Sequence, residues 1–255
     1  MTQHSPSDIL VIDVGATSIK STIVNASGER VQPIRKRKTP RPLGPEGLQE
    51  ILLERVKRET PNRVVVGVPL ECRKGVVWGS GNLTRSGLVT TATNQDLDQE
   101  WHNYPLEQEF ASISGREVVV LNDAALAALG CVAGEGTELV VALGTGFGVA
   151  LTRMGALLDI DDYGERPFKD GRFDSLLGEG ARRADGSRWL ANLVDALTQM
   201  VAEHEATQVW LVGGNAKRLG SADFFELSVP VTIAGNEAPF RGAATVFINP
   251  LVIGR

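Results

Sequence analysis

The feature that most constrains the fold of this chain is a strand–turn–strand pattern that occurs twice. The first copy is Ile9-Leu-Val-Ile-Asp-Val-Gly-Ala-Thr-Ser-Ile-Lys20 and the second is Glu138-Leu-Val-Val-Ala-Leu-Gly-Thr-Gly-Phe-Gly148. Gly15 and Gly144 hold equivalent positions in the two copies. Each copy predicts a β-hairpin whose turn carries few side chains, so its backbone N–H groups can cradle phosphate oxygens. We therefore predict two similar lobes that bind one nucleotide or phosphate chain.

The rest of the chain alternates between apolar runs and helical patterns. Continuous apolar runs predict strands buried on both faces, and they occur at 63–69, 117–121 and 208–212. Amphipathic spacing or a starting proline predicts helices, which are expected at 44–58, 105–113, 176–184, 189–203 and 239–248. Residues 71–100 carry few signals.

This alternation predicts an α/β fold with a mixed central sheet in each lobe. At 255 residues the chain is long enough for two such lobes, each with its own core. The expected division is 1–125 for the first lobe, with the acceptor site, and 126–255 for the second, with the donor site.

Composition argues against several classes of partner. A net charge of −5 does not favour nucleic-acid binding, and no stretch of about 18 apolar residues suggests a membrane helix. Cys72 and Cys131 are far apart, and the three histidines are not spaced as ligands, so no disulfide framework and no zinc site are expected. With a polar N-terminus, the chain is expected to be cytoplasmic.

The two turns hold the first candidate site residues. The pattern Asp-x-Gly-x-Thr-x-x-Lys places a carboxylate beside a phosphate turn, where it can hold Mg²⁺ through water. The alternative is a plain hairpin or a glycine-rich bulge, although glycines in a strand cost stability unless a ligand approaches the backbone. The candidate residues are Asp13 (also the metal residue), Gly15, Thr17, Lys20, Gly144, Thr145, Gly146 and Gly148.

Three further segments carry candidates. Asn122-Asp123 ends a buried strand, where ligands bind in open α/β sheets, so Asp123 is either a general base or a helix cap. Gly213-Gly214-Asn215 is either a phosphate or nucleoside contact or a plain turn. The basic cluster Arg35–Lys38 with Arg41 is either a solvated edge strand or an attraction for a polyanion.

Six motifs, taken in order, resemble the ROK family of repressors and sugar kinases, and its ATP- or polyphosphate-dependent glucokinase branch in particular. They are Asp13-x-Gly-x-Thr-x-x-Lys20, Gly67-x-Pro69, Asn122-Asp123-Ala124-Ala125, Leu143-Gly-Thr-Gly-Phe-Gly148, Val212-Gly-Gly-Asn215 and Gly242-Ala-Ala244.

The resemblance implies the two-lobed, ribonuclease H-like fold of actin-like and hexokinase ATPases. It also implies Mg²⁺ near Asp13, ATP or polyphosphate on both hairpins, and Asp123 as the catalytic base. Asn122 and Asn94 would contact the sugar, and a homodimer is expected because the family often dimerises.

Two departures from the family pattern concern the acceptor. The cysteine-rich zinc loop is missing, and the sugar-binding Glu-x-x-His of the glucokinase branch is replaced by Asp162 and Glu165. The leading interpretation is a phosphotransferase with an altered sugar pocket. The alternatives are a non-catalytic nucleotide or sugar sensor, which the altered pair favours, and an actin-like scaffold. The lack of a helix-turn-helix extension does not favour the repressor branch.

Overall fold

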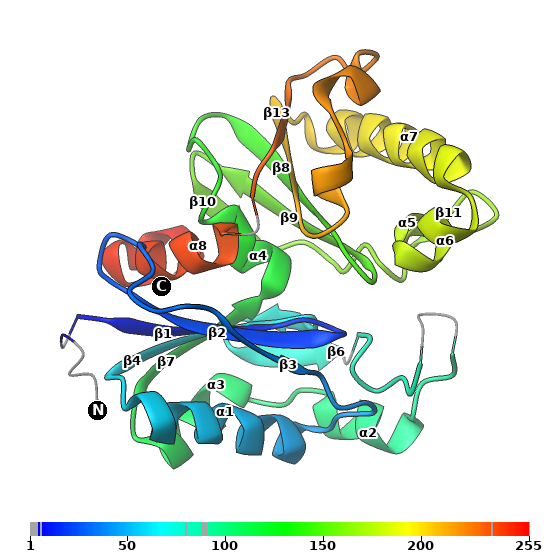
Figure 1. The fold of residues 1–255 in the computed structure, drawn as a ribbon. Coiled ribbons are helices and arrows are strands. Elements are labelled where there is room, and N and C mark those ends of the chain that lie inside the picture. The colour runs from blue at the N-terminus through cyan, green and yellow to red at the C-terminus, as the bar shows by residue number, and fades with distance from the viewer. Residues whose placement is uncertain (1–4, 6, 80, 88–90, 236, 255) are drawn as a thin grey trace.

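The computed structural model describes residues 5, 7–79, 81–87, 91–235 and 237–254. They form two lobes, one above the other in Figure 1, and each lobe is built on a five-stranded mixed sheet. Within these described ranges, no helix is long and apolar enough to span a bilayer.

The two sheets repeat one topology. Their strand orders are β3-β2-β1-β4-β7 and β10-β9-β8-β13-β14, each with three antiparallel strands followed by two parallel strands. The first sheet contains β1 (Ile9–Val14), β2 (Ser18–Val24), β3 (Arg35–Lys38), β4 (Arg63–Val68) and β7 (Glu117–Asn122). The second contains β8 (Thr137–Leu143), β9 (Phe147–Arg153), β10 (Ala156–Leu158), β13 (Gln208–Val212) and β14 (Val231–Ile233).

Helices cover the sheets, and two short hairpins form separate two-stranded sheets. The helices are α1 (Pro45–Glu59), α2 (Gln95–Trp101), α3 (Leu106–Ser114), α4 (Asp123–Ala128), α5 (Phe173–Leu177), α6 (Glu179–Ala184), α7 (Gly186–His204) and α8 (Ala238–Ile248). The short hairpin strands are β5 (Glu71–Arg73) with β6 (Val76–Gly79) and β11 (Pro167–Phe168) with β12 (Gly171–Arg172). The 3₁₀ helices are η1 (Ala216–Arg218), η2 (Ser221–Phe224) and η3 (Pro250–Ile253).

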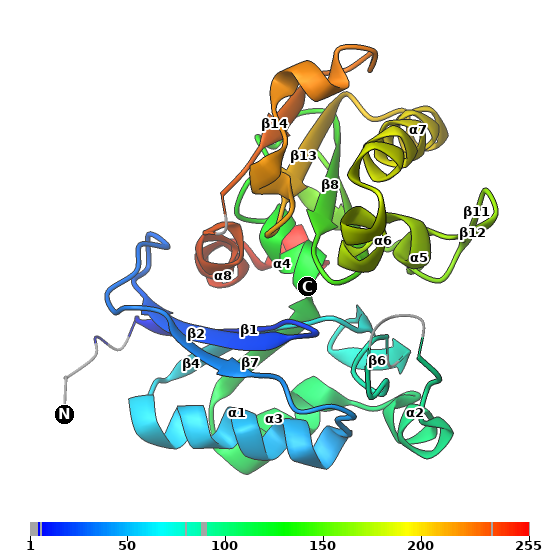
Figure 2. The same ribbon diagram turned by 45° about the vertical axis from the view of Figure 1, so that its right-hand side comes forward.

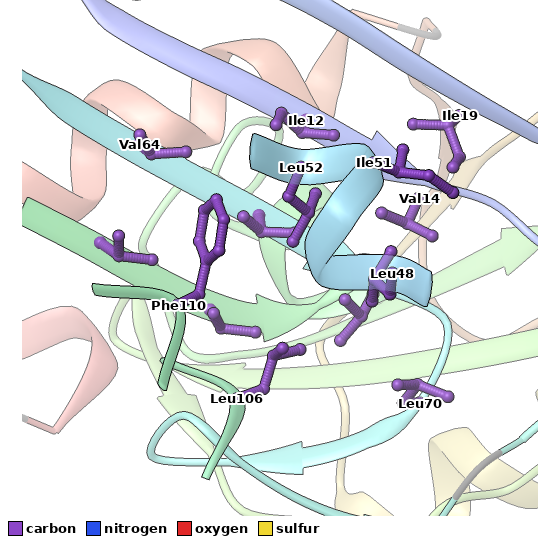
Figure 3. Close-up of a cluster of buried hydrophobic side chains, with 14 of the residues drawn as sticks. Ile12, Val14, Ile19, Leu48, Ile51, Leu52, Val64, Leu70, Leu106 and Phe110 are labelled. Atoms are coloured by element: carbon purple, nitrogen blue, oxygen red, sulfur yellow. The ribbon is translucent and has the colours of Figure 1, made fainter. Parts of the chain in front are cut away.

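The core of the first lobe lies between one face of its sheet and the helices α1 and α3. Figure 3 shows β1 side chains such as Ile12 packed against Leu52 of α1, with Phe110 of α3 beside Val64. Because side chains alternate along a strand, Ile9 and Val11 point to the opposite face. Both faces of the sheet are therefore buried, and each such side chain contributes about 1.5–3 kcal/mol.

The second face of the first sheet is covered by α4 and α8, which lie between the lobes in Figures 1 and 2. Leu126 and Leu129 belong to the cluster on the first sheet, whereas Ala124, Ala127 and Ala128 pack with the second sheet. The helix α4 thus contacts both sheets. The division at residue 125 stays a prediction, and α8, near the C-terminus, packs on the first sheet.

The helices α4 and α8 approach each other at two glycines. A Cβ on Gly130 would lie 1.9 Å from the Ala238 carbonyl oxygen, and one on Gly242 would lie 2.0 Å from the Leu126 carbonyl oxygen. Such distances exclude any side chain without a shift of the backbone. The Gly242-Ala-Ala244 motif is therefore a contact between helices.

Two regions differ from the sequence predictions. The segment 71–100, which carries few sequence signals, contains the β5–β6 hairpin and all but the last residue of α2. The helix predicted over 176–184 is wrong as a single element, because Gly178 separates α5 from α6. A Cβ on Gly178 would lie 2.5 Å from the Thr145 carbonyl oxygen. The second hairpin turn therefore packs directly against the residue that separates the two helices.

Replacement of Gly242 by alanine should lower the free energy of unfolding by about 3 kcal/mol, since the methyl group forces α4 and α8 apart. Urea denaturation followed by circular dichroism measures this change. The control is Gly186→Ala at the start of α7, where a Cβ meets no atom within 4 Å. Equal midpoints for Gly242→Ala and wild type would show that the helix contact tolerates a side chain.

Candidate active site

A cavity of about 400 Å³ opens between the lobes, and both hairpin turns line it. The turn after β1 and the turn after β8 both contribute to its wall, which also carries polar residues from both lobes. The predicted site residues found in its wall are Asp13, Gly15, Thr17, Lys20, Asn122, Asp123, Gly144, Thr145, Gly146, Gly148, Asp162, Glu165, Gly213 and Gly214.

The first turn is held by hydrogen bonds with β2 and with the residue that follows β3. The Gly15 amide donates to the Ser18 carbonyl at 3.1 Å, and the Thr39 hydroxyl donates to the Gly15 carbonyl at 2.7 Å. On the cleft side, Lys20 Nζ lies 2.8 Å from Asp13 Oδ2, because the two residues are opposite partners in the hairpin. The turn thus presents a fixed carboxylate–ammonium pair next to its backbone amides.

The Asp13 carboxylate fits a magnesium ion shared with donor phosphates. Mg²⁺ in nucleotide sites is held by one or two carboxylates while phosphates and water supply the remaining oxygens. Asp13 offers such a buried carboxylate in the cavity wall, and Lys20 can neutralise a phosphate beside it. Among the residues described, no three histidine, cysteine or acidic side chains cluster as a complete metal site.

The second turn is fixed from three directions. The Gly144 amide donates to Gly146 O at 3.2 Å, and Gly144 O accepts from Asn215 Nδ2 at 3.2 Å and from the Glu179 amide at 3.1 Å. Gly213 adopts a φ of 95°, and a Cβ there would meet Leu143 O at 2.5 Å. Asn215 does not line the cavity, so its observed contact positions the turn.

The glycines of the second turn differ in what surrounds them. A Cβ on Gly146 would meet Asp174 Oδ1 at 2.6 Å, and one on Gly148 would meet the Ala124 Cβ at 3.3 Å. A Cβ on Gly144 would meet no protein atom within 4 Å. Gly146 is therefore required by the protein itself, whereas Gly144 leaves open space in the cavity wall.

Asn122 and Asp123, at the end of β7, make different contacts. Asn122 Oδ1 accepts from the amides of Ala124 and Ala125 as the cap of α4, and its Nδ2 donates to Leu70 O. Asp123 accepts from Ala124 through one oxygen at 2.8 Å. Burial, together with the nearby charge of Asp13, raises the pKa of Asp123 to about 7. A carboxyl group with this pKa can take up a proton near neutral pH.

The predicted acceptor residues Asp162 and Glu165 both line the cavity but differ in their contacts. Asp162 accepts from the Gly164 amide at 2.8 Å, and although it is open to the cavity, the protein around it raises its pKa to about 6 by desolvation. Glu165 pairs with Arg85 at 3.2 Å and with Arg172. The charge of Glu165 is thus already paired with two arginine side chains of the protein.

Asn82 and Asp174 are hydrogen-bonded polar residues of the cavity wall that the sequence did not predict. Asp174 is buried, accepts from the Phe147 amide at 2.6 Å and from Asn82 Nδ2 at 2.9 Å, and has a pKa raised by burial. The Asn82–Asp174 bond joins the two lobes across the cavity. Neither residue lies in a recognisable motif, because their partners are far away in the sequence.

Asn94, like Asn215, is a predicted site residue that does not line this cavity. It is exposed, and its side chain accepts from the Leu97 amide at 3.2 Å as the cap of α2. It is absent from the cavity wall formed by the described residues, where Asn82 is the asparagine that the first lobe's loop contributes. Its contact with a sugar stays a prediction.

The basic cluster divides between the two faces of the edge strand β3. Arg35 and Arg37 turn toward α1, where they pair with Glu59 and Glu54 at 3.1 and 3.0 Å. Lys36 and Lys38 lie opposite Lys20 and Ser18 in the register, and Lys36, Lys20 and Ser18 line the cavity. Arg41 donates to the carbonyls of Asn82 and Arg85. We call Lys20, Lys36 and Lys38 the lysine strip.

The repeated sheets and the two hairpin turns facing one cavity define a two-lobed protein of the actin-like ATPase fold. A model of the ROK family matches residues 9–159, which is more than half of the sequence. The chain belongs to the ROK family. A search of curated proteins finds no match.

Solved structures share this fold over nearly the whole chain. The inorganic polyphosphate/ATP-glucomannokinase from Arthrobacter sp. strain KM is 26% identical, with a TM-score of 0.79, covering 95% of this chain and 98% of that one. A ROK family glucokinase from Streptomyces griseus, in complex with glucose and AMPPNP, is 16% identical with a TM-score of 0.73, covering 94% and 98%. A ROK family transcriptional regulator, a homologue of the E. coli MLC protein, is 13% identical with a TM-score of 0.65, covering 97% and 79%.

Replacement of Gly144 by valine should weaken donor binding at least about tenfold, because a branched side chain fills the space that phosphate needs. Titration calorimetry with Mg²⁺–ATP and with tripolyphosphate measures the affinity. Thermal unfolding serves as the control and should change little, since a Cβ meets no protein atom there. Unchanged affinity in a folded variant would show that this turn is not a phosphate site.

Proposed function

We propose that this protein is a phosphotransferase that moves a phosphoryl group from ATP or polyphosphate to a hydroxyl group of a sugar-like acceptor. The observation that carries the proposal is Asp123, a carboxyl group with a pKa of about 7 in the same cavity as both hairpin turns. A base near neutral pKa beside two phosphate turns is what transfer to a hydroxyl requires.

The chemistry follows from the positions of the residues. The turns at Gly15 and Gly144 bind the phosphate chain, and Lys20 offsets its charge. Bound Mg²⁺, held at Asp13, would neutralise charge that develops on the phosphoryl group. The acceptor oxygen forms the new P–O bond as the bond to the leaving phosphate breaks, and Asp123 receives the hydroxyl proton. Closure of the lobes would exclude water and limit hydrolysis.

A second candidate is a sensor that binds nucleotide or sugar without catalysis. The contacts of Glu165 favour it, because this residue is engaged by two arginines where the glucokinase branch has a sugar-binding histidine. Family membership is compatible with either candidate, since the similar structures include a transcriptional regulator. Homodimer formation and a cytoplasmic location stay predictions from the sequence.

The test of the proposed function is phosphate-donor consumption. The purified protein is incubated with Mg²⁺, ATP or polyphosphate, and a panel of neutral and amino sugars and polyols. The phosphotransferase proposal expects donor loss that depends on one acceptor and yields its phosphate ester. Saturable sugar or nucleotide binding without any ester would favour the sensor.

Asp123→Asn should lower turnover by roughly 10²–10⁴-fold, the usual contribution of a positioned base, while donor affinity changes little. The variant should also unfold at a higher temperature than wild type at about pH 8. The reason is that burial raises the folded-state pKa of Asp123 to about 7, above the ordinary value of 3.8. The wild-type protein therefore loses stability as the pH rises from about 4 to about 7, and the asparagine variant does not. This advantage should disappear toward about pH 4, where both states bind the proton. Near-normal turnover would exclude the base role.

The lysine strip supports polyphosphate as a donor, because three ammonium groups extend from the first turn along one face of β2 and β3. Like charges opposite each other destabilise a sheet, and a polyanion would relieve that repulsion. Lys36→Gln with Lys38→Gln should therefore raise the KM for long-chain polyphosphate about tenfold or more, since two charge contacts are lost. The matched control removes two charges near α1, by Arg37→Gln with Lys57→Gln. An equal loss in both double variants would indicate a general charge effect.

A further inference from the structure

The end of the cavity proposed to bind the acceptor is lined by more acidic than basic side chains. Four carboxyl side chains line it, and they are Asp123, Asp162, Glu165 and Asp174. The arginines that reach this region, Arg85 and Arg172, both pair with Glu165. Over the part of the chain that the structure describes, no lysine or arginine forms an ion pair with the other three carboxyl groups.

The hydrogen bonds made by the protein leave mainly acceptor atoms open. Asp174 uses both oxygens, on the Phe147 amide and on Asn82 Nδ2. Asp123 and Asp162 each use one oxygen, on the amides of Ala124 and Gly164. Asn82 Oδ1 is buried and has no partner among the described residues. A ligand that satisfies the open carboxylate oxygens of Asp123 and Asp162 must be rich in donors.

An ammonium group matches this requirement better than a hydroxyl group does. It provides three donors and no acceptor, whereas a hydroxyl group provides one donor and needs donors in return. Its charge also compensates carboxylates that have been partly removed from water, which is costly without a counter-charge. Desolvation, together with neighbouring carboxyl groups, raises the pKa of Asp123 to about 7 and that of Asp162 to about 6.

We propose that the acceptor is an amino sugar, whose ammonium group binds at Asp162, beside the Asn82–Asp174 pair, while one of its hydroxyl groups faces Asp123. The inference rests on the proposed function for the identity of the cavity and deepens it by naming the class of acceptor. The ammonium group takes no part in the transfer. Asp162 is a specificity residue for this charge.

The test compares three probes that share a pyranose ring, namely glucosamine, glucose and N-acetylglucosamine. Acetylation keeps the substituent at the same carbon but removes its charge. Titration calorimetry with wild-type protein at about pH 6.5, where carboxyl groups with raised pKa are only partly ionised, should show glucosamine binding about tenfold or more tighter than either neutral sugar. Glucosamine binding should also release protons, since its charge lowers the pKa of the carboxyl groups. Buffers of different ionisation enthalpy reveal that release.

Asp162→Asn should remove most of the preference for glucosamine and reduce the proton release. The control is Asp159→Asn, which makes the same change in charge three positions away at an exposed residue outside this cavity. It should retain both effects. The same proteins are then assayed for donor consumption with each sugar, and the ratio of kcat/KM for glucosamine and glucose should follow the binding preference.

The outcomes separate the two proposals. Glucose phosphorylation as efficient as that of glucosamine would overturn the amino-sugar inference while the phosphotransferase function stands. Glucosamine binding that depends on Asp162, without phosphorylation of any sugar, would uphold the inference and overturn the phosphotransferase. A preference for glucosamine that survives in Asp162→Asn, or no binding and no turnover of glucosamine, would overturn the inference.

Discussion

The rest of the structure depends on the packing of one short helix, α4, against both sheets. Its leucines contact the first sheet and its alanines the second, so the small side chains let the second sheet approach closely. Asn122 and Asp123 stand at the start of this helix, where β7 ends. The position of the candidate base is therefore fixed by the same contact that joins the lobes, and Gly130 and Gly242 allow α8 to secure that contact.

Repetition of one topology explains how two distant segments come to line a single cavity. In each sheet the hairpin is followed by two parallel strands in the same order. With the sheets packed on opposite sides of α4, both hairpin turns open into the space at its N-terminus. Removal from water and a neighbouring Asp13 then raise the pKa of Asp123, so the geometry that brings the two turns together also changes the acidity of the candidate base.

Local sequence patterns were sufficient for most of the fold and for the two hairpin turns that line the cavity. The turns at Gly15 and Gly144 can be recognised in the sequence because the glycines that their backbone requires are local. The acceptor side depends on contacts between residues far apart in the chain. Asn82 meets Asp174, Arg85 meets Glu165, and Gly178 breaks a predicted helix because Thr145 lies against it. No periodicity encodes such contacts. Asn94, which the family resemblance suggested, caps α2, and its contact with a sugar stays a prediction.

The charge of β3 has a consequence for behaviour in solution. This strand is an edge strand of the first sheet, and an edge strand offers unpaired backbone groups to any other extended chain. Four consecutive cationic side chains occupy it, on both faces of the ribbon. Two molecules that approach each other through these edge strands would bring the positive charges together and repel each other. The segment that faces the cleft thus also protects the protein against strand-mediated aggregation.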